Sequence, residues 1–313
     1  MARRLRHLLA TCVAAGLALP SLAATEAAQP RFEPMVAADA PTVRHFTVDG
    51  LSVIFQPAPT PEQEQEQEQE RPRPLRVYVA ASAPGLAPII IESMSYPAGN
   101  VPTYAIVRLH QDDPAPSLLV QTYSGGAHCC ADYIALTPVG DALKAVSVGF
   151  FNGGPGDDIP IDRDGDGRVD IAVRDDRFLY AFAPYYASWA PPMYLNVVDG
   201  EVIDVSTRPA YRKELNDYAA QALKACGDTA EPHRNGACAV YVALKARMGQ
   251  YAQSLKQVAP FINREERFFL PTGCAVDVGQ NPCPEGQEVR YDRFEDALHA
   301  YLKQINYLAP RAE

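Results

Sequence analysis

Short runs of β-branched and aromatic residues, separated by Gly, Pro or Asp, dominate the chain up to residue 205. Such runs are typical of β-strands joined by tight turns. Two of them, 43–48 and 51–55, flank Asp49-Gly50, a dipeptide that favours a type I′ hairpin. We expect an antiparallel β-rich domain over residues 43–205, built as a sandwich or as a partial propeller-like meander. The further runs occupy residues 76–80, 88–92, 103–109, 117–123, 131–136, 143–149, 169–173, 177–182, 193–198 and 201–205.

The pattern changes after Pro209, where apolar residues recur with the spacing of amphipathic helices. One helix is expected around Leu215–Leu223 and a second around Val240–Tyr251. A third is expected over residues 293–308, with Asp292 as its N-terminal cap. The sequence therefore predicts an α+β fold, in which the β-rich domain is followed by a small helical region at 206–313.

The N-terminus has the pattern of a secretory signal peptide. Three arginines precede an apolar run from Leu8 to Leu19, and cleavage near Ala23-Ala24 would remove residues 1–23. That run is shorter than the roughly 20 residues that a membrane-spanning helix needs, and no later segment reaches this length. We expect a periplasmic or secreted protein with no membrane span after signal removal.

Two segments lack the apolar residues that a packed core requires. Residues 24–42 are rich in Ala, Pro and Glu without periodicity, which predicts a disordered mature N-terminus. Residues 57–74 hold a Glu/Gln repeat between Pro-rich flanks. This composition favours a solvated low-complexity insertion within the β-rich domain, and an acidic interaction arm is the alternative.

The chain is acidic, and its charge argues against a nucleic-acid partner. Residues 1–23 contain three arginines and no acidic residue, so their removal takes the formal net charge from -10 to -13. Binding to a phosphate backbone requires clustered Lys and Arg. An acidic exported protein is better suited to holding cations.

Six cysteines remain after Cys12 is lost with the signal peptide, an even number that suits an oxidising compartment. Closeness in sequence favours pairing Cys226 with Cys238 and Cys274 with Cys283, which would staple the helical region. The adjacent Cys129 and Cys130 favour a structural disulfide. A soft-metal site with His128 and a reactive thiol are the alternatives.

The most specific chemical motif is the Asp loop, residues 162–170, with the sequence Asp-Arg-Asp-Gly-Asp-Gly-Arg-Val-Asp. Calcium takes six to eight oxygen ligands at roughly 2.3 to 2.6 Å, and this spacing of carboxylates could supply most of them. An EF-hand would need a Glu at position 12, where Val173 stands. A solvated Asp/Gly turn without an ion is the alternative.

The Asp loop resembles the calcium loops of FG-GAP and VCBS repeats, in which Asp-x-Asp-x-Asp-Gly-x-x-Asp runs directly into a β-strand. The resemblance covers Asp162 to Tyr180, and the longer span from Ser124 to Phe182 looks like a group of uncharacterised exported bacterial proteins. The resemblance implies that Gly167 permits the turn. We predict that the ion mainly orders this turn. The ligands implied are the carboxylates of Asp162, Asp164, Asp166 and Asp170 and the carbonyl of Arg168.

An aromatic cluster follows the Asp loop and includes Tyr185, Tyr186 and Trp189. These rings could stack on a sugar or a peptide, or they could belong to a loop packed over the core. The chain has no Gly-x-Ser-x-Gly and no His-Glu-x-x-His motif, so no catalytic residue is assigned. A binding role is therefore favoured over an enzymatic one.

The leading hypothesis is an exported calcium-binding protein, in which calcium stabilises a β domain that binds an envelope protein or glycan. An envelope-polymer hydrolase with Asp157 and Asp158 as carboxylates is one alternative, although adjacent acids seldom hold the separations that such chemistry needs. A redox or metal-handling protein using His128-Cys129-Cys130 is another.

Overall fold

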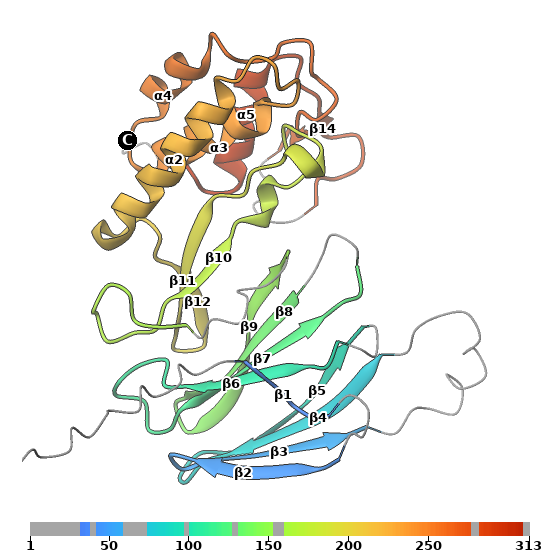
Figure 1. Cartoon of the computed structure of the whole chain (residues 1–313), viewed down its shortest axis with the longest axis vertical. Coiled ribbons are helices and arrows are strands. Elements are labelled where there is room, and N and C mark those ends of the chain that lie inside the picture. The colour runs from blue at the N-terminus through green and yellow to red at the C-terminus, as the bar shows by residue number, and fades with distance from the viewer. Residues whose placement is uncertain are drawn as a thin grey trace, which may run out of the picture. The chain divides into compact units, whose positions relative to one another are not determined.

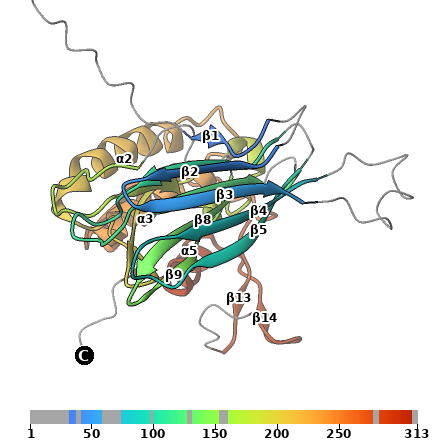
Figure 2. The same ribbon diagram turned by 90° about the horizontal axis from the view of Figure 1, so that it is seen from below.

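Two antiparallel sheets form the first part of the fold in the computed structural model (Figures 1 and 2). The structure describes residues 32–37, 42–58, 74–96, 100–126, 131–152, 160–276 and 282–308. The four-stranded sheet consists of β2 (Arg44–Val48), β3 (Leu51–Pro57), β4 (Leu75–Ser82) and β5 (Ile89–Ser95). The five-stranded sheet consists of β1 (Glu33–Pro34), β6 (Thr103–Val107), β7 (Ser117–Tyr123), β8 (Ala131–Val139) and β9 (Ala142–Phe151). Consecutive strands are neighbours in both sheets, except that β1 pairs with β6.

The five-stranded sheet packs against other parts of the protein on both faces. Successive side chains of a strand point to opposite faces, so neighbouring residues enter different cores. Leu118 and Val120 of β7 enter a sandwich core that also contains residues of the four-stranded sheet. Leu119, between them, enters a different, middle core that includes Ile171 and Leu195. Leu118, Leu119 and Val120 are all fully buried. The continuous apolar run of β7 therefore reflects burial on two sides.

A small three-stranded sheet supplies the other side of the middle core and carries the helices on its opposite face. It consists of β10 (Ile171–Arg174), β11 (Pro192–Val198) and β12 (Glu201–Asp204). Tyr194 of β11 lies in a helical core with residues from all four helices of the described chain. Figure 1 shows these helices next to the three-stranded sheet. These helices are α2 (Arg212–Cys226), α3 (Asn235–Arg247), α4 (Tyr251–Val258) and α5 (Phe294–Gln304).

Helix α3 is the centre of the helical region. Ten consecutive residues from Asn235 to Leu244 are buried, which is the pattern of a helix surrounded by protein on all sides. The structure joins Cys226 at the end of α2 to Cys238 in α3, and it also joins Cys274 to Cys283. Cys274 lies in the short hairpin of β13 (Gly273–Cys274) and β14 (Glu288–Val289).

The expected α+β fold is confirmed, with antiparallel β-sheets first and most helices toward the C-terminus. The hairpin at Asp49-Gly50 also forms, with φ angles of 47° and 87° that match a type I′ turn. None of the helices in the described ranges has both the length and the apolar character needed to cross a membrane.

The strand expected at 177–182 is wrong. Asp175 accepts a hydrogen bond from the backbone N–H of Arg177 and opens a 3₁₀ turn, η1 (Asp176–Phe178). Phe178 and Phe182 both enter the helical core, and neither lies in a strand. The β-like composition of this segment reflects aromatic burial and not sheet pairing.

Three smaller expectations also differ from the structure. Tyr251 begins α4 instead of ending α3, because Gly249 adopts a φ of 75° and interrupts the helix. Asp292 does not cap α5, whose preceding residue Arg293 makes no capping side-chain bond. Residues 32–37 are not disordered, since β1 pairs with β6 and Met35 is fully buried.

Several predicted features lie outside the described residues. These are the signal peptide at 1–23, most of the low-complexity insertion, and the residues of the two alternative functions, His128, Cys129, Cys130, Asp157 and Asp158.

Replacing Leu119 with Ala tests the two-sided burial of the five-stranded sheet. The substitution opens a cavity in the middle core, so the free energy of unfolding should fall by about 2–5 kcal/mol. Ile90→Ala is the matched control, because Ile90 is 72% exposed on the four-stranded sheet, and it should cost less than about 1 kcal/mol. Urea unfolding measures both, and equal losses would contradict the arrangement of layers.

Candidate metal centre at the Asp loop

The Asp loop brings three carboxylates together. One oxygen from each of Asp162, Asp164 and Asp166 lies within 4.8 Å of the others. Asp162 organises the loop by accepting from the N–H groups of Gly165 (2.7 Å) and Gly167 (2.9 Å). Gly167 has a φ of 84°, and a Cβ there would lie 2.9 Å from Nε2 of Gln111. The positive φ therefore favours glycine at the point where the loop turns back.

A protein cation already contacts two of these acids. Nη1 of Arg208 lies 2.9 Å from Asp164 and also bonds Asp166. Partial burial favours a higher pKa for the Asp166 carboxyl, but the N–H of Arg168 and the guanidinium of Arg208 outweigh it and lower that pKa. The hydrogen bond to Asp164 correspondingly raises the pKa of Arg208 against its desolvation. The loop is thus an anionic site that stabilises positive charge.

Asp170 plays a different part from the three clustered acids. Its carboxylate is fully buried and accepts from the N–H of Arg163 (2.7 Å) and from Nδ2 of Asn196 (2.8 Å). Asn196 lies on β11 and donates as well to the carbonyl of Val169 (2.9 Å). A buried carboxylate needs such partners, so Asp170 anchors the end of the Asp loop to the three-stranded sheet.

Arg168 lies between the clustered acids and this anchor. Its backbone N–H donates to Oδ1 of Asp166 (2.9 Å), and it forms an isolated antiparallel bridge with His110. The structure therefore gathers Asp162, Asp164 and Asp166, and it places Asp170 and Arg168 in backbone-fixing contacts. The assignment of these residues as calcium ligands stays a prediction.

The three aromatic residues expected to bind a ligand have different surroundings. Trp189 is half-buried against Tyr218, with ring centroids 5.6 Å apart. Tyr185 accepts a hydrogen bond from Nδ2 of Asn152 (2.7 Å). Tyr186 is 76% exposed and contacts the ring of His233 edge-on.

Phe268 lies close to these aromatic residues, although no sequence pattern around it predicts a binding role. Phe268 is 89% exposed and packs against Phe269, which in turn meets the ring of His233. We define the aromatic surface as Tyr186, His233, Phe268 and Phe269. Its members come from distant segments, so only the fold brings them together.

A second charged cluster joins the three-stranded sheet to the helices. Asp175 is 1% exposed and accepts from Nε and Nη2 of Arg177 (2.7 Å each) and from the hydroxyl of Tyr307 (2.6 Å). Nearby, Oδ2 of Asp204 accepts from Nη2 of Arg247 (2.8 Å). Burial favours a higher pKa for the Asp204 carboxyl, but Arg247 and Ser206 outweigh it and lower that pKa.

Comparison with known protein families gives a match in the helical region. Residues 211–306 match the family described as the sll0997 C-terminal domain. This range covers the four helices and leaves the Asp loop outside it. The likeness of the loop to FG-GAP and VCBS repeats therefore stays a prediction.

Two curated relatives extend the similarity. Over 222 residues the chain is 33% identical to a probable thylakoid lumen protein, sll0997, of Synechocystis sp. (strain ATCC 27184 / PCC 6803 / Kazusa), covering 66% of this chain. Over 204 residues it is 32% identical to an uncharacterized protein, y4bJ, of Sinorhizobium fredii (strain NBRC 101917 / NGR234), covering 63% of this chain. The matches span 61% and 31% of the lengths of these relatives. No solved structure matches the chain.

The Asp204–Arg247 pair predicts a pH dependence that Asp204→Asn should remove. A carboxyl whose folded pKa lies below 3.8 stabilises the fold above that pH, and the stabilisation is lost as the pH falls through the folded pKa. The wild-type protein should therefore be more stable than the variant at about pH 6, and the difference should shrink below about pH 3.8. Urea unfolding at each pH measures it. A difference that stays constant or grows on acidification would be inconsistent with the pair.

Proposed function

We propose that the protein is an exported, non-enzymatic calcium-binding protein, in which the ion orders the Asp loop and the fold presents a surface to an envelope protein or glycan. The observation that carries the calcium proposal is the 4.8 Å limit on the distances among the carboxylate oxygens of Asp162, Asp164 and Asp166. Two oxygens on opposite sides of a calcium ion, each at roughly 2.3 to 2.6 Å, lie about 4.6 to 5.2 Å apart. The cluster has the dimensions of one coordination sphere.

The hydrogen bonds within the loop also support the calcium proposal, because they hold the loop in a conformation that can accept a cation. The Asp162 carboxylate fixes two backbone N–H groups, and Asp170 fixes the far end, so few conformational changes are needed on binding. Three acids this close repel one another unless a cation neutralises them. Arg208 provides part of that positive charge. On ion binding it would have to release Asp164 or Asp166, which would then bind the ion.

Export is supported by the similarity to a protein named as a probable thylakoid lumen protein and by the disulfides Cys226–Cys238 and Cys274–Cys283. Disulfides persist in oxidising compartments such as the periplasm. Calcium at roughly 10⁻⁴ to 10⁻³ M is sufficient to fill sites of extracellular modules. A weak site would therefore be occupied outside the cytoplasm.

Calcium should stabilise the protein, and the effect should depend on the clustered acids. At about 100 times the dissociation constant, a ligand that binds only the folded state adds about 2.7 kcal/mol to the free energy of unfolding. Calorimetric unfolding with calcium and with chelator measures this shift. Asp164→Asn should greatly reduce it, and Asp141→Asn, an exposed turn acid outside the loop, should leave it unchanged.

Arg208→Gln gives an opposite and sharper test of the same site. Removing the cation that shares Asp164 and Asp166 should raise calcium affinity, while lowering stability in chelator. Titration calorimetry measures the affinity. If calcium leaves the unfolding midpoint unchanged in the wild type and in this variant, the calcium proposal fails.

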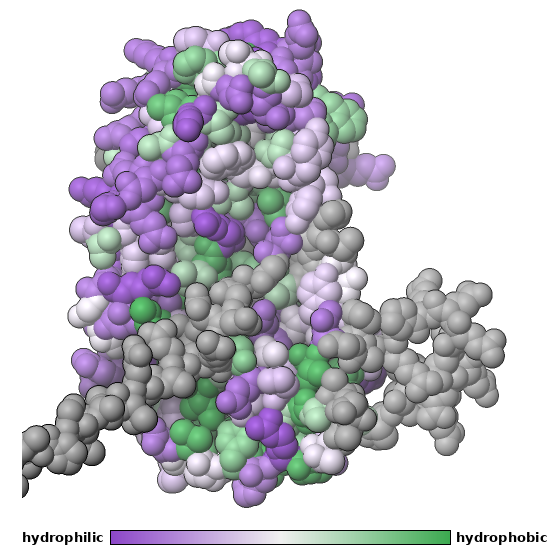
Figure 3. Space-filling view, in the orientation of Figure 1, coloured by the Kyte–Doolittle hydropathy of each residue, from purple (hydrophilic) through white to green (hydrophobic). Residues whose placement is uncertain are grey.

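The aromatic surface is the best-supported place for the partner. Tyr186 and Phe268 are among the most exposed large hydrophobic side chains of the described residues. On the face shown in Figure 3 the helical part is mainly hydrophilic. Aromatic rings of this kind supply contact area for sugars and peptides at little entropic cost.

Replacing Tyr186 and Phe268 together with Ala should abolish capture of an envelope component. The wild-type protein, immobilised and exposed to envelope extract, should retain a protein or glycan that the double variant does not. Tyr78→Ala, on the outer face of the four-stranded sheet, is the control and should retain it. Equal capture by all three proteins would exclude the aromatic surface, and turnover of an envelope polymer would overturn the binding role.

A further inference from the structure

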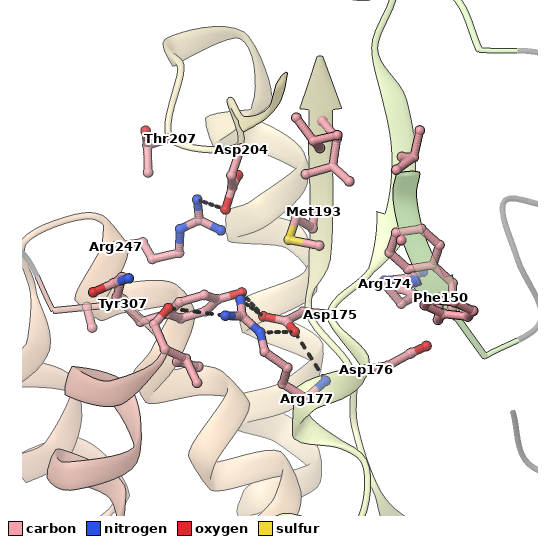
Figure 4. A pocket seen from close by; sticks show the side chains of 18 of the residues that line it. Phe150, Arg174, Asp175, Asp176, Arg177, Met193, Asp204, Thr207, Arg247 and Tyr307 are labelled. Carbon is pink, nitrogen blue, oxygen red and sulfur yellow. Dashed lines mark hydrogen bonds and ion pairs between the residues drawn. The ribbon is translucent and has the colours of Figure 1, made fainter. Parts of the chain in front are cut away.

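A cavity of about 680 Å³ lies beside the Asp204–Arg247 pair and is separate from the Asp loop and the aromatic surface (Figure 4). Strand β9, the three-stranded sheet and the helical region all contribute to its wall. Its size falls in the range of about 300 to 1,000 Å³ that is usual for small-molecule sites. One part of the wall is apolar and includes Phe150, Met193 and Val202.

The acids in the wall are already hydrogen-bonded within the protein. Asp175 is held by Arg177 and Tyr307, as Figure 4 shows. Asp204 accepts from Arg247 and from Ser206, and Asp176 accepts from the backbone N–H of Asn152. A ligand would therefore find little acceptor capacity on these carboxylates.

In contrast, the guanidinium of Arg247 has a hydrogen-bond donor that is not used within the protein. The Arg247 side chain is only 8% exposed, and its Nη2 donates to Asp204. Its Nη1 is buried and makes no hydrogen bond of good geometry to the described residues; the Tyr307 hydroxyl, which also interacts with this guanidinium, donates its proton to Asp175. The guanidinium lies over the ring of Tyr307, with its central carbon 4.7 Å from the ring centroid, which restrains its orientation. A buried guanidinium N–H without an acceptor is costly, so an acceptor from a ligand would be stabilising.

Arg174 adds a further positive charge to the wall. Its guanidinium is stacked over the ring of Tyr218 at 4.8 Å, and the residue is exposed. The other charged residues of the lining are Arg177, Arg247 and the aspartates Asp175, Asp176 and Asp204, so three positive charges face three negative ones and the lining is formally neutral. The preference for an anionic ligand therefore comes from the spare donor of Arg247, and a phosphate dianion would meet stronger repulsion from the aspartates than a singly charged group.

We propose that this cavity binds a small organic carboxylate, whose carboxylate accepts from Nη1 of Arg247 and whose apolar part lies against Met193, Val202 and Phe150. The planar guanidinium fork matches a carboxylate in geometry as well as in charge. The apolar wall selects a carboxylate with a hydrocarbon chain or ring over a hydrophilic one such as acetate. This site is independent of calcium and of the aromatic surface.

Titration calorimetry with octanoate and its neutral isostere octanamide tests the proposal on the full chain. The two probes share the hydrocarbon chain and differ in the charge of the head group. Octanoate should bind saturably, and octanamide should bind at least about tenfold more weakly because it lacks a charge-assisted bond to Arg247. No binding of octanoate, or equal binding of the two probes, would overturn the proposal.

Two variants separate the head-group and chain contacts. Arg247→Gln should weaken octanoate binding by about tenfold and leave octanamide binding nearly unchanged. Met193→Trp enlarges a side chain of the apolar wall, leaves Asp204 and Arg247 unsubstituted and should weaken binding of both probes. Arg212→Gln, an exposed arginine at the start of α2, is the matched control and should bind octanoate like the wild type. Unchanged octanoate binding in Arg247→Gln or Met193→Trp, with circular dichroism confirming the fold, would place the probe elsewhere and reject this site.

Discussion

Strand β11, the middle strand of the sheet formed by β10, β11 and β12, is buried on both faces, and the rest of the structure depends on this burial. Ile171 and Leu195 face the middle core, while Tyr194 faces the helical core. Every polar group on such a sheet must find a partner within the protein. Asn196 and Ser206 meet this need on one face, since Asn196 bonds Asp170 and the hydroxyl of Ser206 accepts from the N–H of Tyr194.

These obligatory partners fix the functional elements in place. Asp170 is held by Asn196, so the Asp loop enters β10 with a defined end, and its three remaining acids converge above the sheet. Asp175, at the other end of β10, bonds Tyr307 beyond α5 and so ties the sheet to the last helix. The cavity with Arg247 lies beside this connection. The Asp loop, the helices and the cavity are therefore all positioned by one small sheet.

Local patterns in the sequence predicted the elements whose causes are local. Asp49-Gly50 produces its hairpin because both residues adopt positive φ, and Cys226 lies near enough to Cys238 for pairing by proximity alone. The sequence also predicted the convergence of Asp162, Asp164 and Asp166, since alternate acids around glycines form a compact turn. Arg208 and Asn196, which neutralise and anchor that turn, lie beyond it in the sequence, and no local pattern identifies them as its partners. The segment 177–182 was misread because its aromatic residues are buried against helices, and composition does not distinguish this from a strand.

A crystal structure, from crystals grown with enough calcium chloride to fill the site, tests the central claim most directly. We predict one ion at roughly 2.3 to 2.6 Å from carboxylate oxygens of Asp162, Asp164 and Asp166. We also predict that Arg208 withdraws from at least one of the two acids that it bonds here, while Asp170 keeps its bond to Asn196. A structure with no ion at the Asp loop, in which Arg208 still bonds both Asp164 and Asp166, would contradict the claim that this loop is a calcium site.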